Sequence, residues 1–283
     1  MTQATASTIL DFIQLERIEQ DIFRGESKDL GTPQVYGGQV LGQALEAARL
    51  TVQDRDVHSV HAYFLRRGDF TAPIVYQVDR SRDGGSFSAR RVVAIQHGQP
   101  IFTLSASFQK PEQGLDYYEP KQLPDSPDVL AQKGLLPDDS TRSAIRLLAS
   151  DFEAYAVAQD ADNNSGTLRW WIKSRERLPD EIALHKTVLA YVSDFGLLQA
   201  TLLPHAPATK ARRELVKKMV MASIDHAIWF HRPLRIDEWL LYECRPISTS
   251  NARGCAHGSV YDAGGVLVAS TFQEGLIRLD QDY

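Results

Sequence analysis

The chain carries an internal repeat, and this feature restricts its fold more than any other. Three short motifs recur, and their matching positions are His61 and His226, Arg90 and Arg253, and Gln109 and Gln273. The offsets agree closely (226 − 61 = 165, 253 − 90 = 163, 273 − 109 = 164). Self-similarity at one fixed period is typical of a duplicated structural unit. The sequence therefore predicts two copies of one unit, joined in tandem.

Each copy has the pattern of a helix followed by antiparallel strands. Apolar residues recur at helical spacing over 38–49 and again over 184–198. Alternating apolar and polar residues, rich in aromatic and β-branched types, predict strands. These strands cover 57–65 and 74–78, a hairpin of 86–95 with 101–109, and a hairpin of 254–261 with 266–273.

The repeat divides the chain into two units and a connection. We expect an N-terminal unit over 1–110 and a C-terminal unit over 181–283. Between them, 111–180 is richer in Pro, Asp, Ser and Gln, which is typical of a linker. Within the linker, a helical pattern spans about 142–155. Near the N-terminus, Thr8 to Asp11 has the form of a capping box and predicts a short helix.

Charge and composition argue against several classes of function. The formal net charge is −5 and the lysines and arginines form no run, so a nucleic-acid partner is not expected. Cys244 and Cys255 are the two cysteines, with no pairing or histidine cluster at metal-ligand spacing, so we expect neither a disulfide nor a metal. No signal peptide or membrane-spanning run is apparent, and we expect a cytoplasmic protein without membrane insertion.

Several segments closely resemble the acyl-CoA thioesterase II family, which includes bacterial thioesterase II and peroxisomal long-chain acyl-CoA thioesterases. The resemblance runs from about Leu10 to Arg278 and is weakest across the linker. Its most specific motif is the nine-residue segment from Asp225 to Pro233. The other segments that carry it are 34–45, 58–68, 86–90, 223–224 and 273–275.

The resemblance implies a fold and an activity. The fold is an α+β double hotdog, in which two fused units each wrap an antiparallel sheet around a long helix. The activity is hydrolysis of fatty acyl-CoA, of medium to long chain, to free fatty acid and CoA without any cofactor. It also implies a homodimer or homotetramer.

The same resemblance places three catalytic residues on Asp194, Ser223 and Gln273. Asp194 lies in the second apolar helix and is expected to activate a water, although a solvated surface carboxylate is the alternative. Ser223, at the start of the strand with Asp225, is expected to hold that water. The chain has no nucleophile elbow, and an ordinary strand serine is the alternative. Gln273, at the end of the last strand, completes the set.

The repeat also bears on how many sites a chain carries. Gln109 is the counterpart of Gln273, so a glutamine at this place can be structural. The strand offset relates Asp194 to Leu30 (194 − 164 = 30), which is not an acid. We therefore expect one site per chain, in the C-terminal half.

Gly37 and Gly38, before the first helix, are candidate substrate-binding residues. Backbone amides at a helix N-terminus can receive a thioester carbonyl or a CoA phosphate, and a tight turn is an equal alternative. By contrast, His61, His226 and His231 are expected to be packed and hydrogen-bonded rather than catalytic. The equivalent repeat positions of the two arginines, Arg90 and Arg253, favour structural roles.

Two other functions remain open. One is a hydratase-type enzyme with the hotdog fold, although the short histidine signature of those families is absent. The other is a non-catalytic acyl-CoA-binding protein, which would not need the acid, hydroxyl and amide set.

Overall fold

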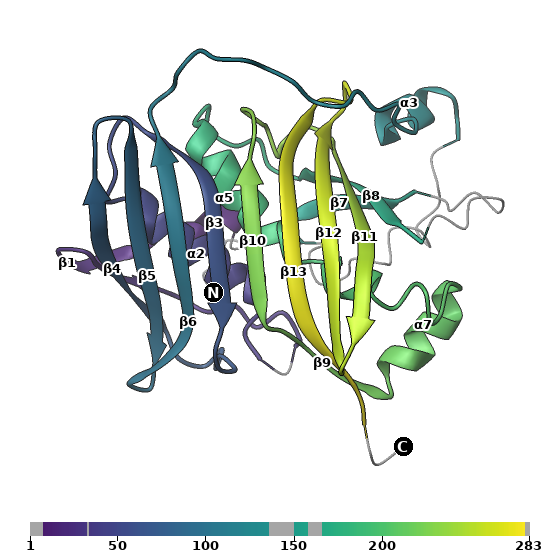
Figure 1. The fold of residues 1–283 in the computed structure, drawn as a ribbon, viewed down its shortest axis with the longest axis horizontal. Helices are drawn as coiled ribbons and strands as arrows, with labels where there is room; N and C mark the ends of the chain where they lie inside the picture. Colours follow the sequence, from purple (N-terminus) through teal and green to yellow (C-terminus); the bar gives the residue numbers. More distant parts are fainter. Residues whose placement is uncertain (1–7, 33, 136–149, 158–165, 281–283) are drawn as a thin grey trace, which may run out of the picture.

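A computed structural model describes residues 8–32, 34–135, 150–157 and 166–280. These residues form one antiparallel sheet of 13 strands, in the order β1-β2-β4-β5-β6-β3-β10-β13-β12-β11-β8-β7, with β9 beside β13 (Figure 1). The strands of the first half are β1 Glu16–Glu19, β2 Ile22–Gly25, β3 Asp56–Phe64, β4 Ile74–Asp83, β5 Phe87–Gln96 and β6 Gln99–Gln109. Those of the second half are β7 Phe152–Ala156, β8 Leu168–Ser174, β9 Met219–Ser223, β10 Asp225–Phe230, β11 Leu240–Ser250, β12 Arg253–Asp262 and β13 Leu267–Leu279.

The two halves meet where β3 pairs with β10. His61 lies opposite Ala227 and Val60 lies opposite Ile228 in antiparallel register. The matching motifs of the repeat therefore lie side by side at the centre of the sheet. The duplication has produced one continuous sheet, since ladder hydrogen bonds cross the junction.

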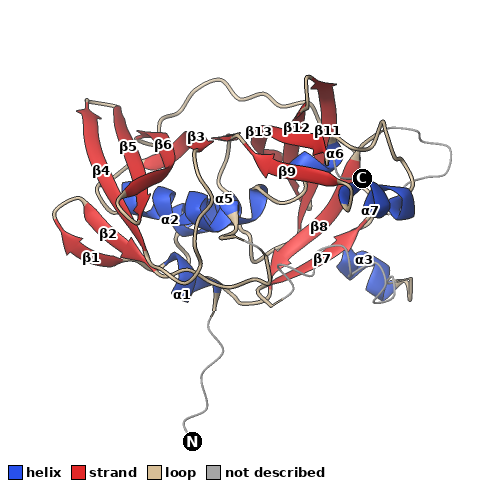
Figure 2. Cartoon of the chain, turned by 90° about the horizontal axis from the view of Figure 1, so that it is seen from below, coloured by secondary structure: helices blue, strands red, loops and turns tan. Residues whose placement is uncertain are grey.

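Two long helices lie on one face of this sheet. They are α2, Gly37–Arg49, and α5, Ile182–Ser193, and Figure 2 shows them side by side beneath the sheet. The shorter helices are α1 Ile9–Ile13, α3 Pro127–Gln132, α6 Leu197–Ala200 and α7 Thr209–Val216. In α1, Thr8 and Asp11 form the predicted capping box. The expected double hotdog is confirmed.

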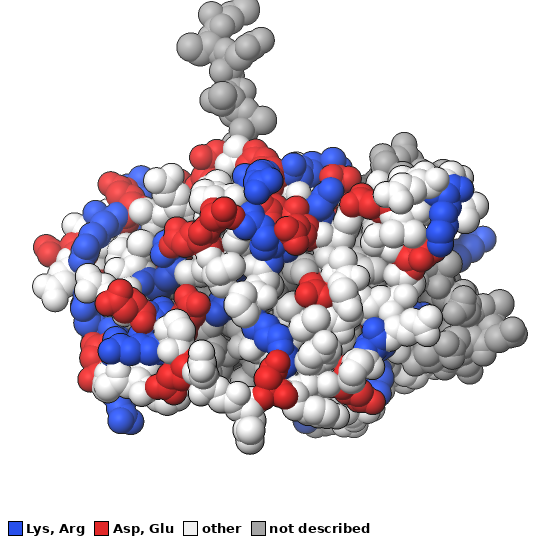
Figure 3. Space-filling model, turned by 90° about the horizontal axis from the view of Figure 1, so that it is seen from above, with Lys and Arg blue, Asp and Glu red and all other residues white. Residues whose placement is uncertain are grey.

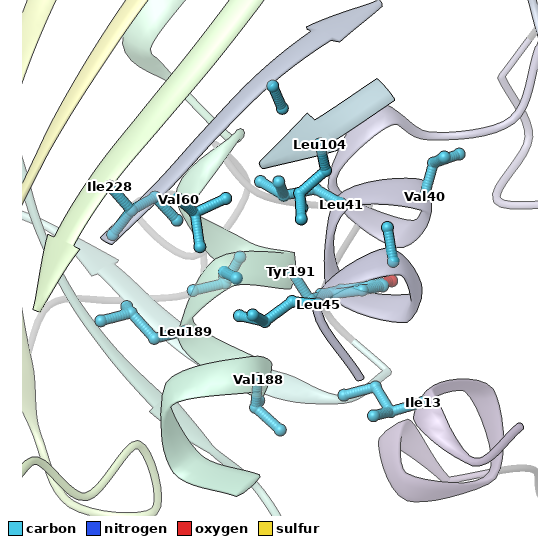
Figure 4. Close-up of a cluster of buried hydrophobic side chains, with 14 of the residues drawn as sticks. Ile13, Val40, Leu41, Leu45, Val60, Leu104, Val188, Leu189, Tyr191 and Ile228 are labelled. Carbon is cyan, nitrogen blue, oxygen red and sulfur yellow. The ribbon is translucent and has the colours of Figure 1, made fainter. Parts of the chain in front are cut away.

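The main core lies between these helices and the sheet (Figure 4). Leu41 and Leu45 of α2 and Val188 and Leu189 of α5 are fully buried, together with Val60 of β3. Burying such a side chain contributes roughly 1.5–3 kcal/mol. The apolar stripes that predicted the helices therefore fasten each helix to the sheet.

The two helices are antiparallel, and they pack closely because α2 has glycine where it contacts α5. A Cβ atom on Gly38 would lie 2.0 Å from the backbone oxygen of Tyr191, and one on Gly42 would lie 3.1 Å from the Tyr191 Cβ. At the other end, Arg49 of α2 forms an ion pair of 2.6 Å with Glu181, which precedes α5. The N-terminus of α2 thus meets the C-terminus of α5.

The second helix is shorter than predicted. It ends at Ser193, and Gly196 follows with a φ of 90° before α6 begins. A Cβ atom on Gly196 would lie 2.1 Å from the Trp170 indole, so glycine is required here for both space and conformation. The apolar periodicity continued through this break because α6 is also buried, which explains why one helix was expected.

The segment expected as a linker contributes two strands to the second half. β7 pairs with β8, and β8 pairs with β11, although both lie within 111–180. The helix predicted over about 142–155 is wrong where the chain is described, because Phe152–Ala156 form β7. The residues of that prediction before 150 lie outside the described residues. Tyr155 and Trp171 pack with Trp239, which holds these strands to the sheet.

Every helix in the described part of the chain is too short or too polar to traverse a bilayer. Positive and negative side chains are interspersed over the face shown in Figure 3.

Replacing Gly38 by alanine tests the helix contact. We expect Gly38→Ala to lower the free energy of unfolding by about 3 kcal/mol, because the new methyl group would meet backbone rather than a movable side chain. This corresponds to a fall of roughly 10 °C in Tm. Gly85→Ala is the control, since a Cβ there meets nothing within 4 Å. Equal Tm values for the two variants would contradict the close contact.

Candidate active site

Asp194 lies at the C-cap of α5, one residue past the helix, and not within the helix as the sequence suggested. Its carboxyl group points toward the first residues of α2. A Cβ atom on Gly37 would lie 2.7 Å from Asp194 Oδ2, so the carboxylate rests against the Gly37 backbone. The acid of the second half is therefore placed at the start of the helix of the first half.

Ser223 and Gln273 converge on the same carboxyl oxygen. Gln273 Nε2 donates to Asp194 Oδ1 at 2.5 Å, and Ser223 Oγ donates to it at 3.3 Å. Gln273 Nε2 also donates to Ser223 Oγ at 3.1 Å. The three residues that the sequence singled out are thus in direct mutual contact.

A break between β9 and β10 places Ser223. The serine ends β9 and does not open the next strand, as expected earlier. Ile224 separates the two strands and its N–H donates to Glu274 O at 2.9 Å. The Asp225 carboxylate then accepts from the Glu274 N–H at 2.6 Å. Gln273 lies in the middle of β13 and not at its end, because β9 extends the ladder beyond the break.

One acceptor in this cluster has no partner. Gln273 is 1% exposed, and its Oε1 makes no hydrogen bond to any residue that the structure describes. A buried polar atom of this kind is costly unless it is paired with protein or water. A water bound beside Asp194 would satisfy this acceptor.

The two predicted glycines both lie at this site. The N–H of Gly38 donates to the Asp194 carboxylate. Gly37 is the first residue of α2, so its N–H has no intrahelical acceptor. Of these two glycines, Gly37 therefore keeps an amide that can receive a substrate.

Burial raises the pKa of Asp194 above its usual range. Hydrogen bonds from Gln273, Ser223 and the Gly38 N–H oppose this rise because they favour the ionised form. The dipole of α5 disfavours a negative charge at its C-terminus, whereas the N-terminus of α2 favours one. A carboxylate held in this balance is more basic than an exposed aspartate.

Buried polar side chains hold the end of α5 in place. Tyr36 Oη donates to Tyr191 O at 3.1 Å, and Tyr242 Oη donates to Ser193 O at 2.8 Å. The hydroxyl of Ser193 donates to Ala190 O and accepts from His226 Nε2 at 3.0 Å. Burial lowers the pKa of His226 to about 3, so this histidine is neutral. Sequence reasoning assigned no role to Tyr36 or Tyr242, although Tyr36 lies within the resembling segment 34–45.

The described residues of the first half form no equivalent cluster. Its helix α2 has Leu50 at the C-cap, where α5 has Asp194. Leu50 is therefore the structural counterpart of Asp194, and not Leu30, because the helices and the strands of the repeat have different offsets. Gln109 contacts Glu112 at 3.4 Å near the surface. No acid stands in this half where Asp194 stands in the other.

A pocket lies beside the cluster and is lined by both Ser223 and Gly37. Its walls come from the first half of the chain and include Val35, Phe64 and Ile101. Apolar side chains and polar groups, which include Gln34, Arg66 and Arg67, share its lining. A concave site with apolar walls and a few polar groups is typical of a site for a small organic molecule.

Comparisons with known proteins identify the family. Residues 147–276 match the acyl-CoA thioesterase family model, and residues 26–109 match the model of the acyl-CoA thioesterase N-terminal domain. The chain is 37% identical to acyl-CoA thioesterase 2 of Haemophilus influenzae, over 97% of this chain and 98% of the relative. The chain belongs to the acyl-CoA thioesterase family. The predicted membership is confirmed, and it makes the chain a thioester hydrolase.

Further relatives of this thioesterase agree. Acyl-coenzyme A thioesterase 8 of Homo sapiens is 35% identical, over 94% of this chain and 88% of the relative. The crystal structure of an acyl-CoA thioesterase II from Mycobacterium marinum superimposes with a TM-score of 0.80 at 37% identity, covering 97% of this chain and 98% of that one. The likeness spans both halves of the thioesterase.

Other polar residues of the thioesterase lie outside the cluster. Arg90 is 2% exposed and binds Thr51 and Asp83. Arg253 forms an ion pair with Glu274 at 2.9 Å. His61 packs edge-on against Trp229, and His231 shares a hydrogen bond with Ser270.

The acid limb of the pH profile tests how the pKa of Asp194 is set. Activity that needs the ionised carboxylate falls as the pH drops through its pKa. Gln273→Leu removes a hydrogen bond that favours the ionised form, so we expect the acid limb of kcat/KM to move to higher pH. The matched control is Gln109→Leu at the equivalent repeat position, which should leave the limb in place. An unchanged limb in Gln273→Leu would contradict this account.

Proposed function

We propose that this thioesterase hydrolyses fatty acyl-CoA of medium to long chain by direct attack of a water that Asp194 activates. The supporting observation is the convergence of Ser223 and Gln273 on Asp194 at the head of α2. A thioester needs a base for the water and a donor for the carbonyl oxygen, and this cluster contains both.

In the first step, the water donates one hydrogen bond to Asp194 and the other to the unpaired Oε1 of Gln273. Its lone pair then faces the thioester carbon. As the C–O bond forms, one proton passes to Asp194, whose raised pKa favours the transfer. Ser223 and the Gln273 amide keep the carboxylate in position.

Charge then develops on the carbonyl oxygen of the substrate. The N–H of Gly37 and the positive end of the α2 dipole stabilise this charge. When the tetrahedral intermediate collapses, the C–S bond breaks and the thiolate of CoA takes up the proton from Asp194. The products are the free acid and CoA, and the protein returns to its starting state without an acyl-enzyme.

One site per chain forms part of this proposal. Leu50 cannot act as a base where Asp194 does in the other half. The first half instead supplies Gly37 and the pocket walls. Each half is thus needed for a single site.

The proposal also includes a homodimer or homotetramer acting in the cytoplasm. Tyr63 is 57% exposed and Phe272 is 37% exposed. Both lie near the central β3–β10 junction of the sheet. A further copy of the chain would bury these aromatic groups.

Thiol release from a panel of acyl-CoAs, from butyryl-CoA to stearoyl-CoA, tests the activity and the base together. We expect the wild type to release thiol most rapidly from the medium to long chains. We expect Asp194→Asn to lower kcat by roughly 10²- to 10⁴-fold, as loss of a general base does. Ser223→Ala should also be impaired, whereas Ser223→Thr, which keeps the hydroxyl, should retain activity.

Two outcomes would favour the rival functions. Hydration of an enoyl-CoA by the wild type, without thiol release, would indicate a hydratase. Acyl-CoA binding without either reaction would indicate a binding protein. A binding protein would keep its affinity for acyl-CoA in Asp194→Asn.

A further inference from the structure

Two arginines, Arg66 and Arg67, line the pocket beside Ser223. The repeat allows each of them to be compared with the residue at the equivalent position of the second half. The N–H groups of Leu65 and Arg66 both donate to Ile101 O, and those of His231 and Arg232 both donate to Val268 O. In the structure, residues 64–67 (Phe-Leu-Arg-Arg) therefore correspond to 230–233 (Phe-His-Arg-Pro), one residue beyond the sequence offset of 165. Arg66 is thus the counterpart of Arg232, whereas Arg67 is matched by Pro233. A role that follows from the fold alone should be shared by both copies.

Arg66 and Arg232 do share a role. Arg66 Nη1 donates to Pro100 O at 2.6 Å, and Arg232 Nη1 donates to Leu267 O at 2.9 Å. Each arginine fastens the end of its strand to the backbone of the neighbouring strand. Arg66 therefore has a structural task already.

Arg67 has no such task. It is exposed and makes no hydrogen bond or ion pair with any described residue. Yet it lines the same pocket as Ser223 and Gly37. The lining of this pocket includes two arginines and neither Asp nor Glu.

The corresponding pocket of the second half is unsuited to an anion, because carboxylates line it. The pocket there is lined by Glu238 and Asp262 as well as by Arg235. Arg235 is paired with Asp180 and Asp237.

The connection after β6 crosses the end of the sheet where β10 finishes (Figure 1). There Asp116 pairs with Arg232, and Tyr118 packs on its guanidinium at 4.7 Å. Among the described residues, Arg67 of the first-half pocket is therefore unpaired, whereas Arg232 and Arg235 of the second half are paired.

We propose that this pocket takes the pantetheine arm of the substrate and that Arg67 binds a phosphate group of CoA. This inference rests on the proposed function. The amphipathic arm suits the apolar walls formed by Val35, Phe64 and Ile101, and an anionic nucleotide suits the cationic rim. Arginine binds phosphate through charge-assisted hydrogen bonds, often in a bidentate arrangement.

The test compares substrates with and without phosphates. For Arg67→Gln, we expect the KM for an acyl-CoA to rise about tenfold with little change in kcat, since only binding is lost. The same acyl group on N-acetylcysteamine, which lacks the phosphates, should be hydrolysed with an unchanged KM. The matched control is Arg17→Gln on the edge strand β1, which should behave as the wild type with both substrates.

An acyl-dephospho-CoA locates the contact. If the effect of Arg67→Gln disappears with this substrate, Arg67 binds the 3′-phosphate, and if the effect persists, it binds the pyrophosphate. An unchanged KM for acyl-CoA in an active Arg67→Gln enzyme would overturn the inference but leave the thioesterase proposal intact. Equal losses on both thioesters would also overturn it, because they would indicate altered pocket shape. No thiol release by the wild type would instead defeat the proposed function.

Discussion

The partly buried carboxylate of Asp194 is the feature on which the rest of the arrangement depends. A carboxylate at the C-terminus of a helix and largely removed from water is unfavourable on both counts. The start of α2 offsets this cost through the Gly38 N–H and the helix dipole, and the sheet offsets it through Ser223 and Gln273. All of these groups meet only if α2 and α5 pack antiparallel and in contact. That contact in turn requires glycine at the start of α2.

Duplication accounts for this geometry and for its asymmetry. Antiparallel helices from two copies necessarily create two similar ends, each joining one helix start to one helix end. At one end Asp194 faces the glycines, and at the other Arg49 pairs with Glu181. At the second end, an ion pair therefore joins the two helices. The first half contributes a helix start and a pocket to a site whose acid, hydroxyl and amide come from the second half.

Much of the fold could be predicted from the sequence because it follows from local pattern and from the repeat. The hairpins, the two long helices and the double hotdog were expected from periodicity and resemblance. Strands β7 and β8 were missed, since their place depends on packing of Trp171 against Trp239 rather than on any repeat signal.

The identity of the three site residues was predicted from the family resemblance. How they are placed relative to one another could be learned only from the structure. The break at Ile224 and the end of α5 before Gly196 depend on contacts between distant segments, which no local pattern encodes. For the same reason no local pattern indicated that Tyr36 and Tyr242 hold the end of α5, although Tyr36 lies within the resembling segment 34–45.

The central claim is that water, activated by Asp194, attacks the thioester directly. A single turnover with excess enzyme in water enriched in ¹⁸O tests this most directly, with mass spectrometry of both product and protein. Direct attack predicts one ¹⁸O atom in every molecule of fatty acid and a protein of unchanged mass throughout. An acyl group on Ser223, or ¹⁸O in the carboxylate of Asp194, would contradict the account, because either would mean that the protein itself had acted as the nucleophile.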